Sequence, residues 1–145
     1  MQDSSALVEK IVASDAVFAA ELVKHAADVS VPYSVMAEYY YFFAGLVISD
    51  ELDNQERATK ILGFINHIMN GREYDDETKN MVYLGFIEML LGPVGPNAKD
   101  LDEEFEHKKM KLAKQCFTGE ALYWLRNAVQ HSNDAYRNKY PYIFE

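Results

Sequence analysis

Apolar residues recur along the chain with the spacing of three and four residues that marks one face of an α-helix, and no sustained β-type alternation interrupts them. This pattern predicts an all-α fold, a compact single-domain bundle of about seven helices. Ser4 and Ser5 are candidate N-caps of a first helix. Ser14 and Asp15 are candidates for a second helix, which ends before Pro32.

The stretch 34–48 is apolar on nearly every face and predicts the central helix of the bundle. It contains consecutive aromatic residues from Tyr39 to Phe43, which cannot all point in one direction on a helix. Glu38 is the one acidic residue within it. The sequence leaves open whether this carboxylate faces solvent or is buried with a partner.

Residues 54–91 predict an αα-hairpin. Asp53 followed by Glu56 resembles a capping box that begins the first arm, and Gly71 ends that arm. Both arms contain the tetrapeptide Leu-Gly-Phe-Ile, at 62–65 and at 84–87. This repeat predicts two helices packed through equivalent faces, with a neighbouring backbone close to each glycine.

Two further helices are predicted after the Pro- and Gly-rich loop at 92–97. The first begins among acidic residues and ends among lysines, an order that suits the helix dipole. Thr118 is the candidate N-cap of the second. The aromatic tail after Asn133 is expected to dock on the bundle, because a free tail would expose a contiguous apolar patch.

The composition narrows the class of protein. Of the 145 residues 49% are hydrophobic, which is enough for one core without disulfides or a structural metal. A formal net charge of −9 repels nucleic acid and anionic membrane surfaces. No apolar run approaches the ~20 residues of a membrane span, and no signal-peptide pattern opens the chain. We therefore expect a monomeric cytoplasmic protein without a nucleic-acid or membrane partner.

The sequence contains no recognisable catalytic or metal-binding motif. A di-metal carboxylate bundle requires two Glu-x-x-His pairs, and only Glu104-x-x-His107 is present, so we predict no metal and no cofactor. Cys116, the single cysteine, lies on a core-facing stripe near a helix end, which does not activate a thiol. We expect a protein that is not an enzyme, with a carboxylate-based hydrolase left open as a third possibility.

Acidic residues gather in three clusters, each at the predicted N-terminus of a helix. If alternate helices point the same way, the first and third clusters converge on one end of the bundle and suit a basic partner. The candidate partner-binding acids from these two clusters are Asp50, Glu51, Asp53, Asp100, Asp102, Glu103, Glu104 and Glu106. Reversing Asp102, Glu103 and Glu106 to Lys is expected to weaken binding and leave the helix content unchanged.

The ten tyrosines are the second feature of the sequence that could bind a partner. Tyr39 and Tyr40 are candidate anchors beside the acids, because tyrosine is enriched at the hot spots of protein interfaces. The alternative is that these rings belong to the core and place their hydroxyls at its rim.

The stretch from Asp75 to Leu90, which follows the predicted helix 58–69, resembles small helical bacterial proteins. Members of this group are found among the immunity proteins that neutralise toxins of contact-dependent growth inhibition and related systems. The resemblance covers about residues 56–91, and it is a packing motif without an active site. It implies an interaction protein in the cytoplasm of the toxin-producing cell, whose target is often a nuclease.

The acidic composition and this resemblance lead us to expect an immunity protein. Its acidic, tyrosine-containing surface would cover the substrate groove or active site of a basic nuclease toxin. The alternative is a non-catalytic helical adaptor or regulatory protein with an unrelated partner. The gene immediately upstream distinguishes the two, because a large toxin-delivery protein encoded there favours immunity.

Overall fold

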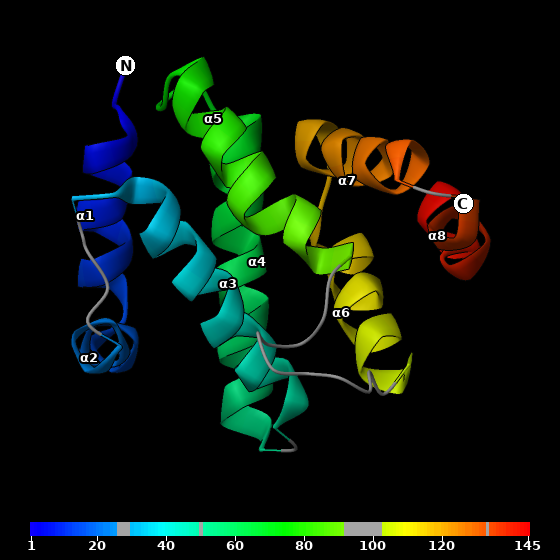
Figure 1. Ribbon diagram of the computed structural model, residues 1–145, viewed down its shortest axis with the longest axis horizontal. Coiled ribbons are helices and arrows are strands. Elements are labelled where there is room, and N and C mark those ends of the chain that lie inside the picture. The colour runs from blue at the N-terminus through cyan, green and yellow to red at the C-terminus, as the bar shows by residue number, and fades with distance from the viewer. Residues whose placement is uncertain (26–29, 50, 92–102, 133) are drawn as a thin grey trace.

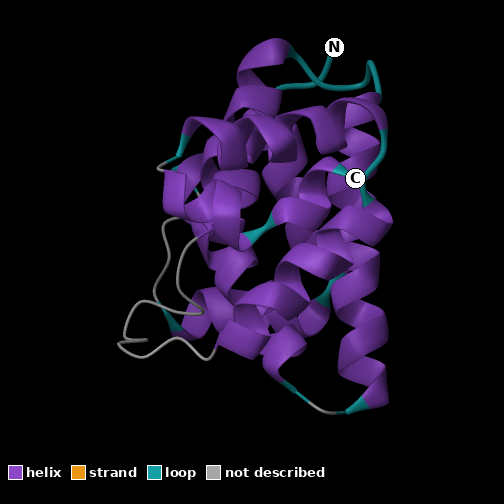
Figure 2. Ribbon diagram, turned by 90° about the vertical axis from the view of Figure 1, so that its right-hand side faces the viewer, coloured by secondary structure: helices purple, strands orange, loops and turns teal. Residues whose placement is uncertain are grey.

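The computed structural model describes residues 1–25, 30–49, 51–91, 103–132 and 134–145, and of residues 134–136 only the backbone. These residues form helices joined by short connections, and their one β-pairing is an isolated bridge between Gln2 and Tyr74 (Figure 2). The predicted all-α class is confirmed. The α-helices are α1 (Ser4–Ser14), α2 (Ala16–Lys24), α3 (Pro32–Ile48), α4 (Leu52–Asn70), α5 (Asp76–Val82), α6 (Glu103–Cys116), α7 (Gly119–His131) and α8 (Asp134–Lys139).

The predicted central helix is α3. It packs against α1, α2, α4, α5 and α6, and Figure 1 shows it between the α1–α2 pair and α4. Pro32 lies in its first turn, where the missing N–H costs nothing. The helix buries residues on several faces, as its sequence predicts. They are Val35, Met36, Tyr39, Tyr40, Phe43, Ala44, Leu46 and Val47.

The predicted N-cap Asp15 is confirmed, and the predicted N-cap of the first helix is wrong. Asp15 accepts hydrogen bonds from the backbone N–H groups of Val17 and Phe18 at the start of α2, and Asp75 accepts one from Thr78 at the start of α5. The cap of α1 is Asp3 and not Ser4 or Ser5, because the helix begins one residue earlier than predicted. Asp is as effective as Ser at this position.

The connection between α3 and α4 is held by Ser49. Its Oγ accepts hydrogen bonds from the backbone N–H of Glu51, at 3.2 Å, and from Nδ2 of Asn54, at 2.9 Å. The N-cap of α4 is Glu51, and no side chain of a described residue caps this helix, so the capping box predicted from Asp53 and Glu56 is wrong. Both acids therefore project from the helix without a capping role.

The second arm of the predicted hairpin consists of α5, a π-helix (Tyr83–Ile87) and a 3-10 helix (Glu88–Leu91). The N–H of Glu88 bonds to the carbonyl of Tyr83, which adds one residue to the turn. A Cβ on Gly85 would lie 2.8 Å from Cγ of Met36, whereas a Cβ on Gly63 would meet nothing within 4 Å. The two arms therefore do not pack through equivalent faces, and the close neighbour of Gly85 is a side chain rather than a backbone.

Helix α7 takes its N-terminal caps from α4. Thr118 lies at the predicted N-cap position, but its side chain makes no capping hydrogen bond. Oδ1 of Asn66 accepts from the N–H of Thr118, at 2.9 Å, and Oδ1 of Asn70 accepts from the N–H of Glu120, at 2.7 Å. These amides satisfy donors that a helix start would otherwise expose.

The C-terminal tail docks on the bundle, as predicted. It ends in α8 and a 3-10 helix (Pro141–Phe144), and Tyr140 and Ile143 are fully buried. Nε of Arg126 donates to the carbonyl of Ile143 at 2.8 Å, and Nζ of Lys114 donates to that of Tyr142 at 3.1 Å. Side chains of α6 and α7 therefore fix the tail by donating hydrogen bonds to its backbone carbonyls.

Candidate functional site

The described members of the first and third acidic clusters lie at one end of the bundle. Figure 1 shows α4 and α6 beginning at its lower end, whereas α5 begins at the upper end. Nζ of Lys108, in the second turn of α6, donates to the carbonyl of Val47 at 3.0 Å and so fixes α6 beside the α3–α4 connection. The exposed acids there are Glu51, Asp53, Glu56, Glu103 and Glu104, and we call them the acidic end.

Apolar side chains accompany these acids. Leu52 is 73% exposed and Ile48 is 38% exposed, and they flank the connection held by Ser49. Within the part of the chain that the structure describes, Asp53 and Glu56 form no ion pair. The acidic end thus combines exposed carboxylates with two exposed apolar residues. Asp50, Asp100 and Asp102 lie outside the described residues.

Three of the predicted partner-binding residues are wrong, because the structure buries them. Tyr39 and Tyr40 face the core from the central helix, Tyr39 against Phe18 and Tyr40 against Phe86. Glu106 is only 2% exposed. It lies on the stripe of α6 that also buries Lys109, Met110 and Ala113. Reversing Glu106 to Lys would therefore disturb the fold, contrary to the sequence-based expectation.

Glu106 belongs to a buried polar cluster. Its carboxylate forms an ion pair with Lys139 and accepts a hydrogen bond from the hydroxyl of Tyr140. Lys109, which is fully buried, donates from Nζ to the hydroxyl of Tyr40 at 2.6 Å. The cluster connects α3, α6 and the C-terminal tail. None of the described pockets is lined by its residues, so we assign it a structural role.

Burial lowers the pKa of Lys109 from 10.5 to about 8, although the charge of Glu106 opposes the shift. The unfolded chain therefore binds more protons than the folded one between these values. The free energy of unfolding is expected to rise by about 2 kcal/mol from pH 8 to pH 10. Burial also raises the pKa of Tyr39, Tyr40 and Tyr142, so stability should fall again above pH 10.

Urea unfolding at intervals of pH measures this effect. The Lys109→Met variant should lack the rise, because it has no ammonium group to lose. If the free energy of unfolding of the variant rises by the same amount, titratable groups other than Lys109 cause the effect.

The second predicted acidic cluster, which consists of Glu73, Asp75, Asp76 and Glu77, contributes two of its acids to the fold. Oε1 of Glu73 lies 3.5 Å from Nζ of Lys10, and the backbone of Glu73 accepts from the N–H of Gln2 at 2.8 Å. Asp75 caps α5. Two of its acids are thereby used in holding the N-terminus to the bundle and in starting a helix.

Glu38 neither faces bulk solvent nor lies fully buried. It is half-buried, and its Oε2 lies 2.9 Å from Nδ1 of His25, whose Nε2 lies 3.5 Å from Glu21. The two carboxylates contact opposite nitrogens of the imidazole and do not converge on one point. Through these contacts the imidazole joins the end of α2 to α3.

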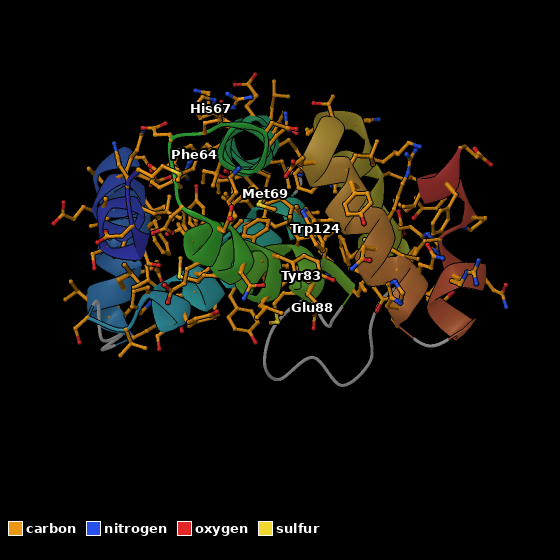
Figure 3. All side chains as sticks on the ribbon, turned by 90° about the horizontal axis from the view of Figure 1, so that it is seen from above. Phe64, His67, Met69, Tyr83, Glu88 and Trp124 are labelled. Carbon is orange, nitrogen blue, oxygen red and sulfur yellow. The ribbon has the colours of Figure 1, made fainter. Side chains whose placement is uncertain are left out.

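An aromatic pocket of about 270 Å³ lies where α4, α5 and α7 meet. Its residues, which the sequence analysis did not select, are Met69, Asp76, Lys79, Asn80, Tyr83, Glu120 and Trp124. Figure 3 shows Tyr83 and Trp124 next to each other, and their ring centroids are 5.1 Å apart. Trp124 is the only tryptophan in the chain, which was the one signal in the sequence.

The described residues contain no group of three or more His, Cys, Asp and Glu side chains placed to hold a metal ion. Burial raises the pKa of the half-buried Cys116 thiol, so this cysteine is not activated as a nucleophile. None of the helices described has the length and apolar character needed to cross a membrane. Comparisons with protein-family models, with curated proteins and with solved structures find no match to this chain.

Proposed function

We propose that this chain is a non-catalytic binding protein that neutralises a basic protein, and specifically an immunity protein whose target is a nuclease toxin. The observation that carries the proposal is the acidic end, where exposed carboxylates at the starts of α4 and α6 lie at the same end of the bundle as the exposed Leu52 and Ile48 (Figure 1). A nuclease presents a basic groove to its substrate. Carboxylates placed over that groove would replace the phosphates and block access by occupancy.

The charges and the apolar residues would have different effects on binding. Carboxylates at the rim steer the encounter, and salt screens this attraction over about 8 Å at physiological ionic strength. Leu52 would supply a desolvated anchor, which mainly slows dissociation. Loss of the acids should therefore reduce the association rate, and loss of Leu52 should raise the dissociation rate.

The test first identifies the gene immediately upstream of this chain and, where it encodes a large secreted protein, uses the C-terminal domain of that protein. Binding is measured by surface plasmon resonance, and inhibition by the degradation of a nucleic-acid substrate. The Asp53→Lys, Glu56→Lys double variant should slow association at least tenfold, equivalent to about 1.4 kcal/mol. Leu52→Ala should raise the dissociation rate with little change in association.

The matched control is the Glu9→Lys, Glu77→Lys double variant. It changes the net charge equally, and its exposed residues lie on α1 and α5, away from the acidic end. An equal loss in both double variants would show that net charge alone drives binding. Absence of such an upstream gene, or an upstream domain that this chain neither binds nor inhibits, would contradict the immunity function and favour the adaptor.

A further inference from the structure

We propose that the aromatic pocket between α5 and α7 binds an arginine side chain presented by a protein partner. The pocket lies near Met69, at the opposite end of α4 from Leu52, about 25 Å away along the helix. It is therefore separate from the acidic end, and the inference does not rest on the proposed function.

The aromatic rings form a fixed wall of the pocket. The Tyr83 hydroxyl accepts a hydrogen bond from Nδ2 of Asn127 at 3.1 Å, and its ring packs against Trp124. Tyr123 packs edge-on against Trp124, with centroids 5.1 Å apart and an interplanar angle of 83°. Trp124 remains partly exposed. A rigid, partly exposed indole is the best aromatic surface for a cation.

The charged groups at the rim suit a cation more than an anion. Asp76 and Glu120 are exposed residues in the first turns of α5 and α7, and neither forms an ion pair with a described residue. Lys79 also lines the pocket and opposes a cation, so the carboxylates exceed the basic groups by one. A guanidinium can stack on an indole and donate to carboxylates at the same time, which an ammonium does less well.

The surface beyond the pocket favours an arginine within a polypeptide over a free molecule. A second, shallower hollow adjoins the first across Trp124 and is lined by Gly119, Glu120, Tyr123 and Trp124. Tyr123 is 60% exposed there. If an arginine side chain of a partner occupied the pocket, the partner's backbone could extend over Trp124 into this hollow.

The test follows the fluorescence of Trp124, the chain's only tryptophan, during titration with N-acetyl-L-arginine amide. We expect saturable binding with a millimolar dissociation constant. The neutral isostere N-acetyl-L-citrulline amide should bind about tenfold more weakly, because it loses the cation–π and carboxylate interactions. Equal binding of the two probes, or tighter binding of free L-arginine than of the capped form, would overturn the proposal.

Variants locate the site, because removing an acidic residue and removing a basic residue of the pocket should change the affinity for arginine in opposite directions. Glu120→Gln and Asp76→Asn should each weaken binding of the capped arginine about threefold, and Lys79→Gln should strengthen it by a similar factor. The matched control Glu103→Gln removes one carboxylate at the acidic end and should change nothing. Isothermal titration calorimetry checks the affinities independently of Trp124, and circular dichroism confirms that each variant is folded. An unchanged affinity in all three pocket variants would place the probe elsewhere.

Discussion

Replacing Glu106 by alanine is expected to lower the free energy of unfolding by about 3–5 kcal/mol. The substitution removes the carboxylate that pairs with Lys139 and accepts from Tyr140. It also leaves the fully buried Lys109 without the negative charge that favours its protonated form. Breaking one member of a buried charge cluster is costly because the remaining charges stay desolvated.

Chemical denaturation followed by circular dichroism measures this loss. Glu103→Ala is the matched control, because Glu103 lies in the same first turn of α6 but is exposed. It should change the free energy of unfolding by less than about 0.5 kcal/mol. If the Glu106 and Glu103 variants lose equally little stability, the buried cluster contributes nothing to the fold.

Replacing Gly119 by alanine is the second change with a large expected effect, a loss of about 2–3 kcal/mol. Gly119 has a φ of +50°, in the left-handed region that disfavours a side chain. An added Cβ would also lie 2.3 Å from Oδ1 of Asn70, the atom that caps the N–H of Glu120. The substitution therefore strains the backbone and displaces the cap of α7.

Gly63→Ala is the control, because Gly63 lies within α4 and an added Cβ would meet nothing within 4 Å. Alanine should raise stability there by up to about 1 kcal/mol, since it favours the helix. Thermal unfolding of both variants compares the two glycines. A stable Gly119→Ala variant would mean that Asn70 moves aside and that its cap of α7 has little weight.

Local patterns in the sequence are sufficient for the all-α class, the central position of 34–48 and the end of α4 at Gly71. Asp15 and Asp75 were also predictable caps, because each bonds N–H groups only two or three residues away. Such features depend on near neighbours in the chain and on helical periodicity. They can therefore be read without knowing which helices meet.

Which acids face solvent was decided by the tertiary structure. Glu106 and Lys109 can be buried on one face of α6 only if polar groups from other elements pair with them. These partners are Lys139, Tyr140 and Tyr40. These residues are distant in sequence, so no local pattern distinguishes the buried Glu106 from the exposed Glu103.

The caps of α7 and the aromatic pocket arise in the same way. Asn66 and Asn70 reach the start of α7 from about fifty residues away. Tyr83 meets Trp124 because a π-helical turn and α7 are packed together. Helical periodicity and composition are enough to predict most of the helices and the excess of negative charge. Only the packing of those helices decided which charged and aromatic side chains are satisfied inside and which remain open to a partner, because that choice depends on contacts between distant segments.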